Sequence, residues 1–101
     1  MHIRRRLELI IERKALPRAS KVLEQAGLKG YTAISAIAGF GQGDHWQRDT
    51  DLSSSRDMVV VISIGEADVI DAALEQLQHL LDQHIGLLSV SDVQIMRPQR
   101  F

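Results

Sequence analysis

The N-terminal part of the chain alternates between apolar and charged positions, the pattern of a β-strand that buries one face. Leu7, Leu9 and Ile11 fall on one side of this segment. The opposite side is charged except for Ile10. The pattern predicts a strand over residues 7–12 with one apolar residue on its polar face.

Two stretches have the periodicity of amphipathic helices. Apolar residues recur at helical spacing from residue 16 until Gly27, which can adopt the left-handed conformation that ends a helix, and Pro17 suits the first helical turn. A second apolar stripe, at positions 70, 74, 77 and 81, predicts a helix that begins after Gly65 and ends near residues 83–84. Gly86 is then the expected stop of that helix.

Three further segments are predicted strands. Residues 31–37 mix small and β-branched side chains, and residues 58–64 are almost all apolar, the pattern of a strand covered on both faces. Residues 87–90 are predicted to form a fourth strand. Residues 93–96 either continue this strand or pair separately. The polar residues 38–57 are interpreted as a loop of about twenty residues, a length that usually has a functional reason.

This order of elements predicts an α+β protein with a ferredoxin-like βαββαβ fold, in which two helices cover one face of a four-stranded antiparallel sheet. Residues 1–101 form a single domain, and residues 97–101 are its C-terminal tail. The uncovered face would carry Ile10 and alternate residues of the third strand, Val59 and Val61 or their neighbours. Because large exposed apolar patches mark interaction sites, we expect an oligomer that packs through this open face.

Composition narrows the class of protein further. The chain has 101 residues, 45% of them hydrophobic, and it has no cysteine, which excludes disulfides, thiol catalysis and cysteine-ligated metals. Twelve basic against thirteen acidic residues create no net field that would attract nucleic acid. No apolar run approaches the roughly 20 residues that span a bilayer, and the basic residues 4–6 do not begin a signal peptide. We expect a cytoplasmic protein without membrane insertion, in which residues 4–6 are a solvated strand end.

Two glycine-rich segments flank the second predicted strand. In segment 27–32 (GLKGYT), Gly30 would permit a second sharp turn after Gly27. In segment 39–43 (GFGQG), the missing Cβ atoms would let backbone N–H groups approach an anion closely. Together with the long loop 38–57, these segments indicate a small ligand-binding module with a mobile reporter loop.

With these elements in this order, the chain resembles the PII superfamily, trimeric cytoplasmic signalling proteins that bind adenine nucleotides between subunits. The similarity runs without gaps from about Leu9 to Thr32 and includes the third strand and the second helix. Residues 39–42 (GFGQ) resemble the Gly-Phe-Gly-Arg-Gln motif at the base of the family's long T-loop, without its arginine. The resemblance implies a regulatory protein that is not an enzyme.

The departures from the family pattern point to one of its branches. Residues 38–57 contain no tyrosine, and residues 84–87 (HIGL) replace the family's phosphate-binding Thr-Gly-x-x-Gly-Asp-Gly-Lys segment. The chain is closer to PII-like proteins linked to inorganic-carbon uptake, including a carboxysome-associated group that binds ADP or AMP with bicarbonate as a further ligand. Because fewer donors are left for a γ-phosphate, this resemblance favours ADP or AMP over ATP. It implies a homotrimer in the cytoplasm, associated with the carboxysome.

The resemblance also implies which residues bind the nucleotide. Ile10 and the turn at residues 30–32 would contact adenine, and the strand edge at Ser63 would offer backbone groups. The glycines at the base of the loop and two arginines of the tail would hold the phosphates. A plainer explanation remains for each. Ile10 could be a subunit contact and Thr32 an ordinary strand residue, while the glycines could form an ordinary turn and the arginines a solvated tail. The implied nucleotide-binding residues are Ile10, Gly30, Thr32, Gly39, Phe40, Gly41, Gln42, Ser63, Gly86, Arg97 and Arg100.

The long loop 38–57 is the candidate for partner recognition. Trp46 is the only tryptophan of the chain, and it is either a docking anchor or a cover for its own domain. Our hypothesis is that nucleotide, together with a small anion such as bicarbonate, orders the loop, which then meets a transporter or a carboxysome component. The loop residues suited to contact an anion or a partner are His45, Trp46, Arg48 and Arg56.

Other functions of this topology fit less well. Acylphosphatases need a phosphate-binding loop after the first strand, but residues 13–17 have no glycine and no nucleophile–base pair converges elsewhere, so no enzyme is predicted. RNA binding needs aromatic residues on the central strands, and residues 58–64 have none. His79 and His84 are off the spacing that aligns two ligands on a helix, and surface or cap positions are expected for them, so no metal is predicted. A trimeric CutA-like metal-binding protein and an amino-acid-binding module that acts as a dimer stay open as alternatives.

Overall fold

The computed structural model describes residues 1–41, 44–47 and 57–97. Within these ranges the chain forms a four-stranded sheet, a separate two-stranded ribbon and two α-helices. Neither α-helix is long and apolar enough to cross a membrane. In chain order the elements are β1 (His2–Glu12), the 3₁₀ turn η1 (Arg13–Ala15), α1 (Leu16–Ala26), β2 (Thr32–Ser35), β3 (Ala38–Gly41), β4 (Asp44–Gln47), β5 (Met58–Gly65), α2 (Ala67–Leu81) and β6 (Gly86–Ile95).

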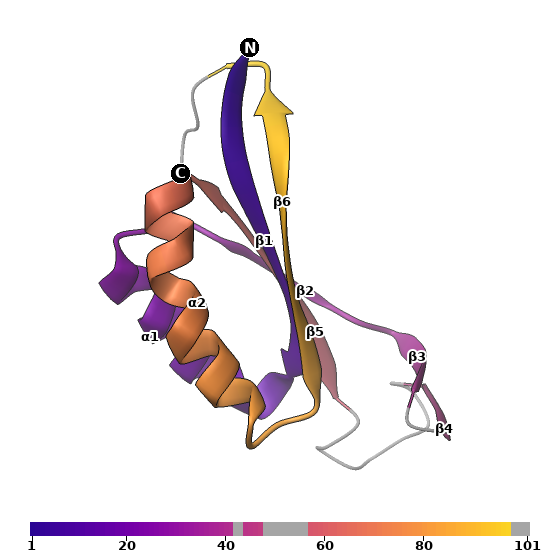
Figure 1. The fold of residues 1–101 in the computed structure, drawn as a ribbon. Helices are drawn as coiled ribbons and strands as arrows, with labels where there is room; N and C mark the ends of the chain where they lie inside the picture. Colours follow the sequence, from indigo (N-terminus) through magenta and orange to yellow (C-terminus); the bar gives the residue numbers. More distant parts are fainter. Residues whose placement is uncertain (42–43, 48–56, 98–101) are drawn as a thin grey trace.

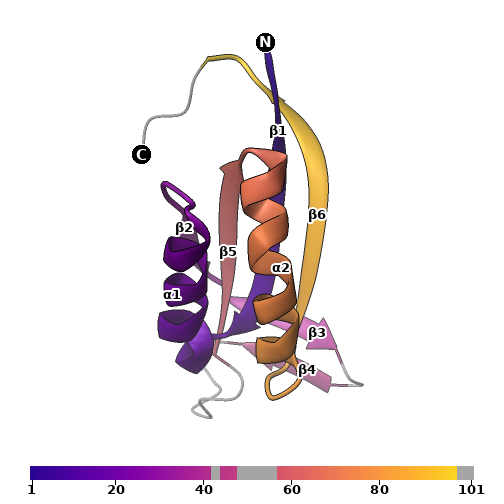
Figure 2. The same ribbon diagram turned by 60° about the vertical axis from the view of Figure 1, so that its left-hand side comes forward.

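The four-stranded sheet is antiparallel throughout, in the order β2-β5-β1-β6. Figures 1 and 2 show that α1 and α2 lie side by side on the same face of this sheet. The first and third strands of the sheet, β1 and β5, are central, and β2 and β6 are its edges. This is the ferredoxin-like arrangement, so the predicted fold class is confirmed.

The core lies between the two helices and the central strands. Leu7, Leu9 and Ile11 of β1 are fully enclosed, and they alternate with side chains of the open face as predicted. Burying a leucine or isoleucine in this way contributes roughly 1.5–3 kcal/mol. The other core residues are Ala15, Ala19, Leu23, Val59, Val61, Ile70, Ala73 and Leu77.

Gly27 ends α1, as the sequence predicts. Its φ is 98°, in the left-handed region that favours glycine. The N–H of Gly27 donates to the carbonyl oxygen of Glu24, and the N–H of Leu28 donates to that of Leu23, both at 3.1 Å, which is a Schellman closure. Gly27 is the only glycine with positive φ in the described part of the chain, so the glycine-specific turn expected at Gly30 is not found.

β1 is longer than predicted because charged residues, rather than apolar ones, continue it towards the N-terminus. The strand already begins at His2, and residues 4–6 form ion pairs instead of a solvated strand end. Arg5 pairs with Asp71 of α2 at 2.8 Å and with Asp92 of β6 at 3.0 Å, and these two carboxylates raise its pKa above the ordinary value. Both partners are remote in the sequence, so hydrophobic alternation does not detect them.

Residues 38–57 are not one continuous loop. β3 and β4 pair in antiparallel fashion, with Gly39 opposite Trp46 and Phe40 opposite His45. Figure 1 shows this ribbon projecting from the end of the four-stranded sheet. The expectation of a loop over its whole length is therefore wrong, because a polar, glycine-rich pair of strands has no hydrophobic alternation to reveal it.

The remaining differences concern the ends of elements. β2 is shorter than the predicted strand 31–37, and a single strand, β6, covers both 87–90 and 93–96. α2 ends at Leu81, and Gly86 opens β6 instead of stopping the helix. Gly86 and residues 93–95 belong to one strand because they pair with β1, and this pairing acts across the sheet and not along the chain.

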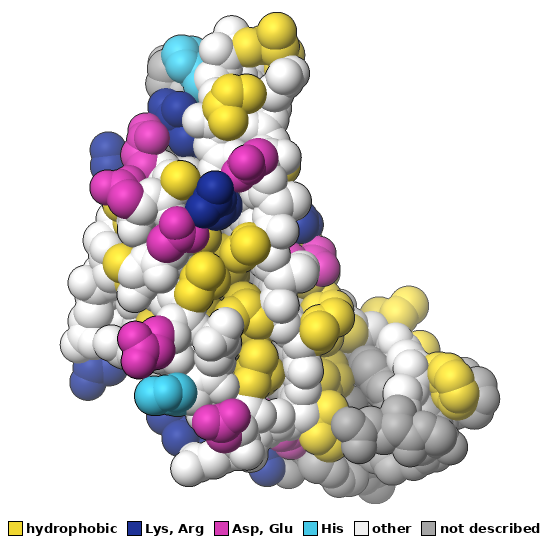
Figure 3. Space-filling model, viewed as in Figure 1, with side chains coloured by type: hydrophobic (Ala, Val, Ile, Leu, Met, Phe, Trp, Pro, Cys, Tyr) yellow, Lys and Arg dark blue, Asp and Glu magenta, His cyan; other side chains and the backbone are white. Residues whose placement is uncertain are grey.

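An apolar row crosses all four strands on the open face of the sheet. The register aligns Ile34 of β2, Val60 of β5, Ile10 of β1 and Leu87 of β6. Directly paired residues of antiparallel strands share a face, so these four side chains lie together. Ile34 is 50% exposed and Leu87 is 62% exposed. Val59 and Val61, the residues on either side of Val60 in β5, point into the core. In the view of Figure 3, hydrophobic side chains also lie in a strip beside α2.

Candidate functional site

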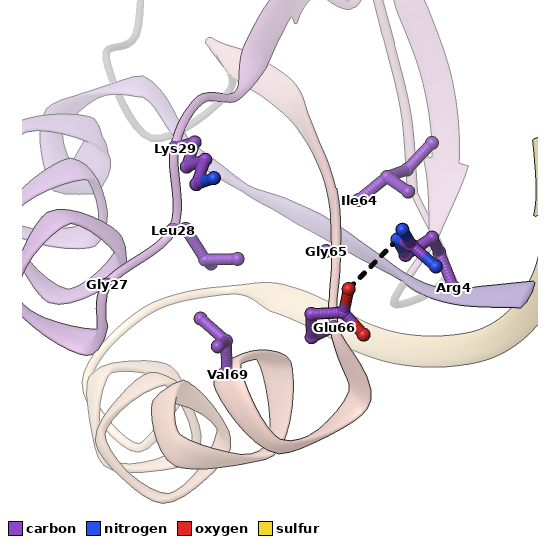
Figure 4. A pocket seen from close by; sticks show the side chains of 8 residues that line it. All are labelled: Arg4, Gly27, Leu28, Lys29, Ile64, Gly65, Glu66 and Val69. Carbon is purple, nitrogen blue, oxygen red and sulfur yellow. Dashed lines mark ion pairs between the residues drawn. The ribbon is translucent and has the colours of Figure 1, made fainter. Parts of the chain in front are cut away.

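A small cavity opens where β5 passes into α2. Its volume is about 180 Å³, and Figure 4 shows that three separate parts of the chain surround it. The segment after α1 forms one wall, the junction of β5 and α2 forms another, and β1 contributes the third. We call this cavity the bay; its lining residues are Arg4, Gly27, Leu28, Lys29, Ile64, Gly65, Glu66 and Val69.

The bay exists because β2 pairs with only part of β5. Their register covers residues 59–62, so the last three residues of β5 have no β2 partner. The segment between α1 and β2 lies on this side instead, and Ser63 Oγ holds it by donating a hydrogen bond to the Gly30 carbonyl oxygen at 2.7 Å. The Tyr31 hydroxyl ties the same segment to α1 by donating to Ser20 Oγ at 2.8 Å.

Two cations stand on opposite walls of the bay. Arg4 Nε lies 3.3 Å from Glu66 Oε1, and the glutamate side chain is largely exposed. Exposed ion pairs add less than about 1 kcal/mol, so an incoming anion can compete for Arg4. Lys29 is exposed, and no described carboxylate pairs with it. With Leu28 and Ile64 as apolar walls, the bay suits a ligand that combines an apolar part with negative charge.

The opposite end of the sheet holds the other group of candidate residues. Ile10 lies on the open face of β1, and Gly86 opens β6 directly opposite Ile11. A Cβ on Gly86 would collide with the carbonyl oxygen of Ile10 and would lie 2.7 Å from a methyl group of Leu81. Glycine is needed here because the two backbones approach closely, which explains the residue without any ligand.

A buried carboxylate beside Gly86 holds the turn between α2 and β6. Glu12 Oε1 accepts a hydrogen bond from the Ile85 backbone N–H at 3.0 Å and contacts His84 Nδ1 at 3.2 Å, and Oε2 lies 3.5 Å from Lys14 Nζ. Burial opposes the charge of Glu12, but these three partners outweigh it, so the pKa of Glu12 is lowered. His84 Nε2 is buried without a hydrogen-bond partner among the described residues. His84 is therefore an interior residue and not the surface or cap residue expected.

The two groups do not meet within one chain. Gly30, Ser63 and the bay lie at one end of the sheet, whereas Ile10 and Gly86 lie at the other. Ile10 pairs with Val60, and four residues of extended strand separate Val60 from the bay, roughly 13 Å. A single ligand that touches both groups needs a second copy of the chain to bring them together.

Comparison with known families agrees with this architecture. The family model of nitrogen regulatory protein P-II matches residues 4–100. The chain belongs to the P-II family. This confirms the resemblance that the sequence indicates. No curated protein matches the sequence at a significant level.

Solved structures of PII-like proteins share this fold. CPII from Thiomonas intermedia K12, a PII-like protein bound to ADP, AMP and bicarbonate, has a TM-score of 0.83 and 26% identity over 96% of this chain and 92% of CPII. A PII-like signalling protein from Thermus thermophilus has a TM-score of 0.72 and 21% identity over 90% of this chain and 87% of its own. A DUF3240 family protein from Shewanella baltica has a TM-score of 0.68 and 16% identity over 100% and 99% of the two chains. The last two likenesses concern the fold alone.

Within this P-II fold, the predicted nucleotide-binding residues occupy several elements. Thr32 is exposed on β2, opposite Ile62, and Arg97 is exposed just beyond the end of β6. Ser63 is buried on the core side of β5, where its hydroxyl is already engaged by Gly30. Gly39, Phe40 and Gly41 form β3, and His45 and Trp46 belong to β4, while Gln42, Arg48, Arg56 and Arg100 lie outside the described residues.

Sequence reasoning misses three polar residues of the bay: Arg4, Lys29 and Glu66. The basic run at residues 4–6 predicts only a solvated strand end, and a lone lysine between two glycines carries no recognisable signal. Only the approach of β1 and the segment after α1 to the end of β5 brings these side chains together.

Proposed function

We propose that this chain is a regulatory protein that binds ADP or AMP in clefts between the subunits of a homotrimer. The observation that carries the proposal is that the candidate residues lie at two opposite ends of one sheet. A neighbouring copy of the chain can bring the two groups together. Membership of the P-II family supports a signalling role without catalysis. CPII, which shares 26% identity with this chain, is bound to ADP, AMP and bicarbonate in its structure.

The open face of the sheet is the proposed subunit interface. Ile10, Ile34, Val60 and Leu87 form the apolar row on this face, and water covers much of it in a single chain. If each subunit buries about 400 Å² of apolar surface at ~25 cal/mol per Å², the gain is about 10 kcal/mol before the costs of association. A trimer formed in this way leaves α1 and α2 on the outside.

The adenine ring is proposed to bind beside the bay. Leu28 and Ile64 offer apolar contact, Thr32 offers a hydroxyl, and the unpaired end of β5 offers backbone groups. The phosphates would meet the glycine-rich β3 and Gly86 of the neighbouring copy, with Arg97 as a bidentate donor. In this arrangement, residues at the bay of one copy bind the adenine, and residues at the opposite end of the sheet of the neighbouring copy bind the phosphates.

We further propose that bicarbonate and nucleotide together control the segment 38–57. The β3–β4 ribbon projects from the end of the sheet that carries Ile10 and Gly86, so it is placed to respond to a ligand there (Figure 1). The ordered segment would then engage a protein of inorganic-carbon metabolism, such as a transporter or a carboxysome component, in the cytoplasm. For the CutA-like alternative, the described residues provide no group of three metal-ligating side chains.

Calorimetric titration and light scattering together test the proposal. The protein is titrated with AMP, ADP, ATP and cyclic AMP, each with and without bicarbonate, and its mass is measured in solution. We expect a trimer that binds ADP or AMP more tightly than ATP. A monodisperse monomer, or a trimer that is silent towards all four nucleotides but binds zinc or copper tightly, would end the proposal.

A further inference from the structure

A groove of about 380 Å³ runs between α1 and α2 on the side away from the sheet. Figure 2 shows the two helices side by side and running in opposite directions. Val22 of α1 and Leu80 of α2 are half-buried between them and form an apolar floor. This groove is separate from the bay and from the open face of the sheet.

Both walls of the groove are polar, and the charged side chains among the lining residues are the two cations on the α1 side. Arg18 and Lys21 stand on the α1 side and His79 on the α2 side, and no carboxylate lines the groove. The lining residues on each side recur at spacings of three, four and seven along the groove, and Gln83 lies just beyond the end of α2. The remaining lining residues are three glutamines: Gln25, Gln76 and Gln83.

The cations of the groove differ from most others of the described chain. No ion pair with a described residue engages Arg18 or Lys21, whereas a carboxylate neutralises each of Arg4, Arg5, Arg6, Arg13 and Lys14. Arg18 also lies in the first turn of α1, at the positive end of the helix dipole, and that turn has no acidic residue to offset it. The two cations therefore make the entrance of the groove strongly favourable for negative charge.

We propose that this groove binds an acidic peptide segment of a partner protein. An apolar side chain of the segment would rest on Val22 and Leu80, and its carboxylates would meet Arg18, Lys21 and His79. Glutamine amides both donate and accept hydrogen bonds, which matches the N–H and C=O groups of a peptide backbone. A small free anion would use the cations but would make no contact with the apolar floor or with the glutamine amides.

The proposal goes beyond nucleotide binding and does not depend on it. The helices lie on the face opposite to the apolar row, so subunit contact through the open face leaves the groove accessible in every copy. The protein would thus carry a docking surface in addition to the segment 38–57.

Fluorescence anisotropy tests the groove with defined probes. A fluorescein-labelled dodecapeptide that repeats Glu-Leu-Glu is titrated at low salt, beside peptides of equal length that repeat Lys-Leu-Lys and Glu-Ser-Glu. We expect binding of the first peptide only, and salt should weaken this binding because dissolved ions screen the attraction between exposed charges. Equal binding of the lysine or serine peptide would overturn the assignment to an acidic apolar peptide. The same holds if citrate, added so that its carboxylate concentration equals that of the peptide, displaces the glutamate–leucine peptide completely.

Variants locate the binding surface. Arg18→Gln/Lys21→Gln should weaken the glutamate–leucine peptide at least tenfold, and Arg18→Lys/Lys21→Arg, which keeps both charges, should restore most of the affinity. Lys21→Gln is matched by Lys29→Gln, which removes an exposed lysine outside the groove and should leave peptide affinity unchanged. Helix content by circular dichroism confirms folding of each variant, and ADP titration of the double variant separates loss of the groove from loss of the nucleotide site. Unchanged peptide binding by the folded double variant, or equal losses in the two single lysine variants, contradicts the proposal.

Discussion

The hydroxyl of Ser63 donates a hydrogen bond to the main-chain carbonyl oxygen of Gly30 at 2.7 Å. Ser63 is buried in β5, and Gly30 belongs to the segment that leads into β2. The bond holds that segment where β2 no longer pairs with β5, and so it shapes the wall of the bay. The side chain of Ser63 therefore shapes the candidate site through another part of the chain.

Removing this hydroxyl should loosen the bay. Ser63→Ala leaves the Gly30 carbonyl oxygen without its partner, and a lost hydrogen bond of this kind lowers the free energy of unfolding by about 1 kcal/mol. We also expect weaker ADP binding, because the wall of the bay is no longer held in place. Urea unfolding and calorimetric titration measure the two effects. If both quantities match those of the unchanged protein, the hydrogen bond does not position the segment.

Gly86 should tolerate no side chain. In Gly86→Ala, the new Cβ meets the Ile10 carbonyl oxygen, which belongs to the backbone of the central strand and cannot move aside. Overpacking of this kind lowers the free energy of unfolding by roughly 1–3 kcal/mol. Gly41→Ala is the matched control for stability, because no atom lies within 4 Å of its added Cβ. Equal stability of the two variants in chemical denaturation would show that β1 and β6 separate more easily than their register indicates.

Glu12 should make stability fall in acid. The pKa of Glu12 is lower in the folded protein than its ordinary value of 4.5, so the unfolded chain takes up the proton first as the pH falls. The stabilisation by Glu12 is present above about pH 4.5 and is lost as the pH decreases through the folded pKa. Glu12→Gln should flatten this part of the stability curve, whereas Glu24→Gln on the exposed surface of α1 should leave it unchanged. If the free energy of unfolding of Glu12→Gln still falls steeply in acid, other carboxylates cause the fall.

The open face of the sheet should control assembly. Leu87 and Val90 are both exposed on β6, at 62% and 45%, but Leu87 pairs with Ile10 on the open face and Val90 pairs with Leu7 on the core side. Leu87→Asp places a charge in the apolar row and should convert the proposed trimer to monomer, while Val90→Asp should not. Light scattering of the two variants decides between them. A trimer that survives Leu87→Asp would place the subunit contact elsewhere.

Thr32 should contribute a side-chain hydrogen bond to the nucleotide. Thr32→Ala removes the hydroxyl at an exposed position of β2, and the loss of about 1 kcal/mol corresponds to roughly fivefold weaker ADP binding. Thr32→Ser keeps the hydroxyl and should bind ADP nearly as well as the unchanged protein. Calorimetric titration distinguishes the two variants, and equal affinity in all three proteins would return Thr32 to the role of an ordinary strand residue.

Several features of this protein are local, and the sequence by itself determines them. Gly27 ends α1 because a left-handed residue is needed there, and Leu7, Leu9 and Ile11 bury one face of β1 because strand side chains alternate. The same local patterns order the elements and so predict the ferredoxin-like fold, whereas the P-II family was indicated by the resemblance of residues 9–32 and 39–42 to the family's motifs. Each depends on neighbours within a few positions, which is why periodicity and glycine placement are sufficient.

Other features depend on residues that are distant along the chain, and only the tertiary structure decided them. The N-terminal half of β1 is a strand because it pairs with β5 and β6, and Gly86 is a glycine because the backbone of Ile10 lies against it. The burial of His84, the bay and the groove between the helices arise in the same way. Contacts across the sheet and between helices act through space, so no pattern along the sequence records them.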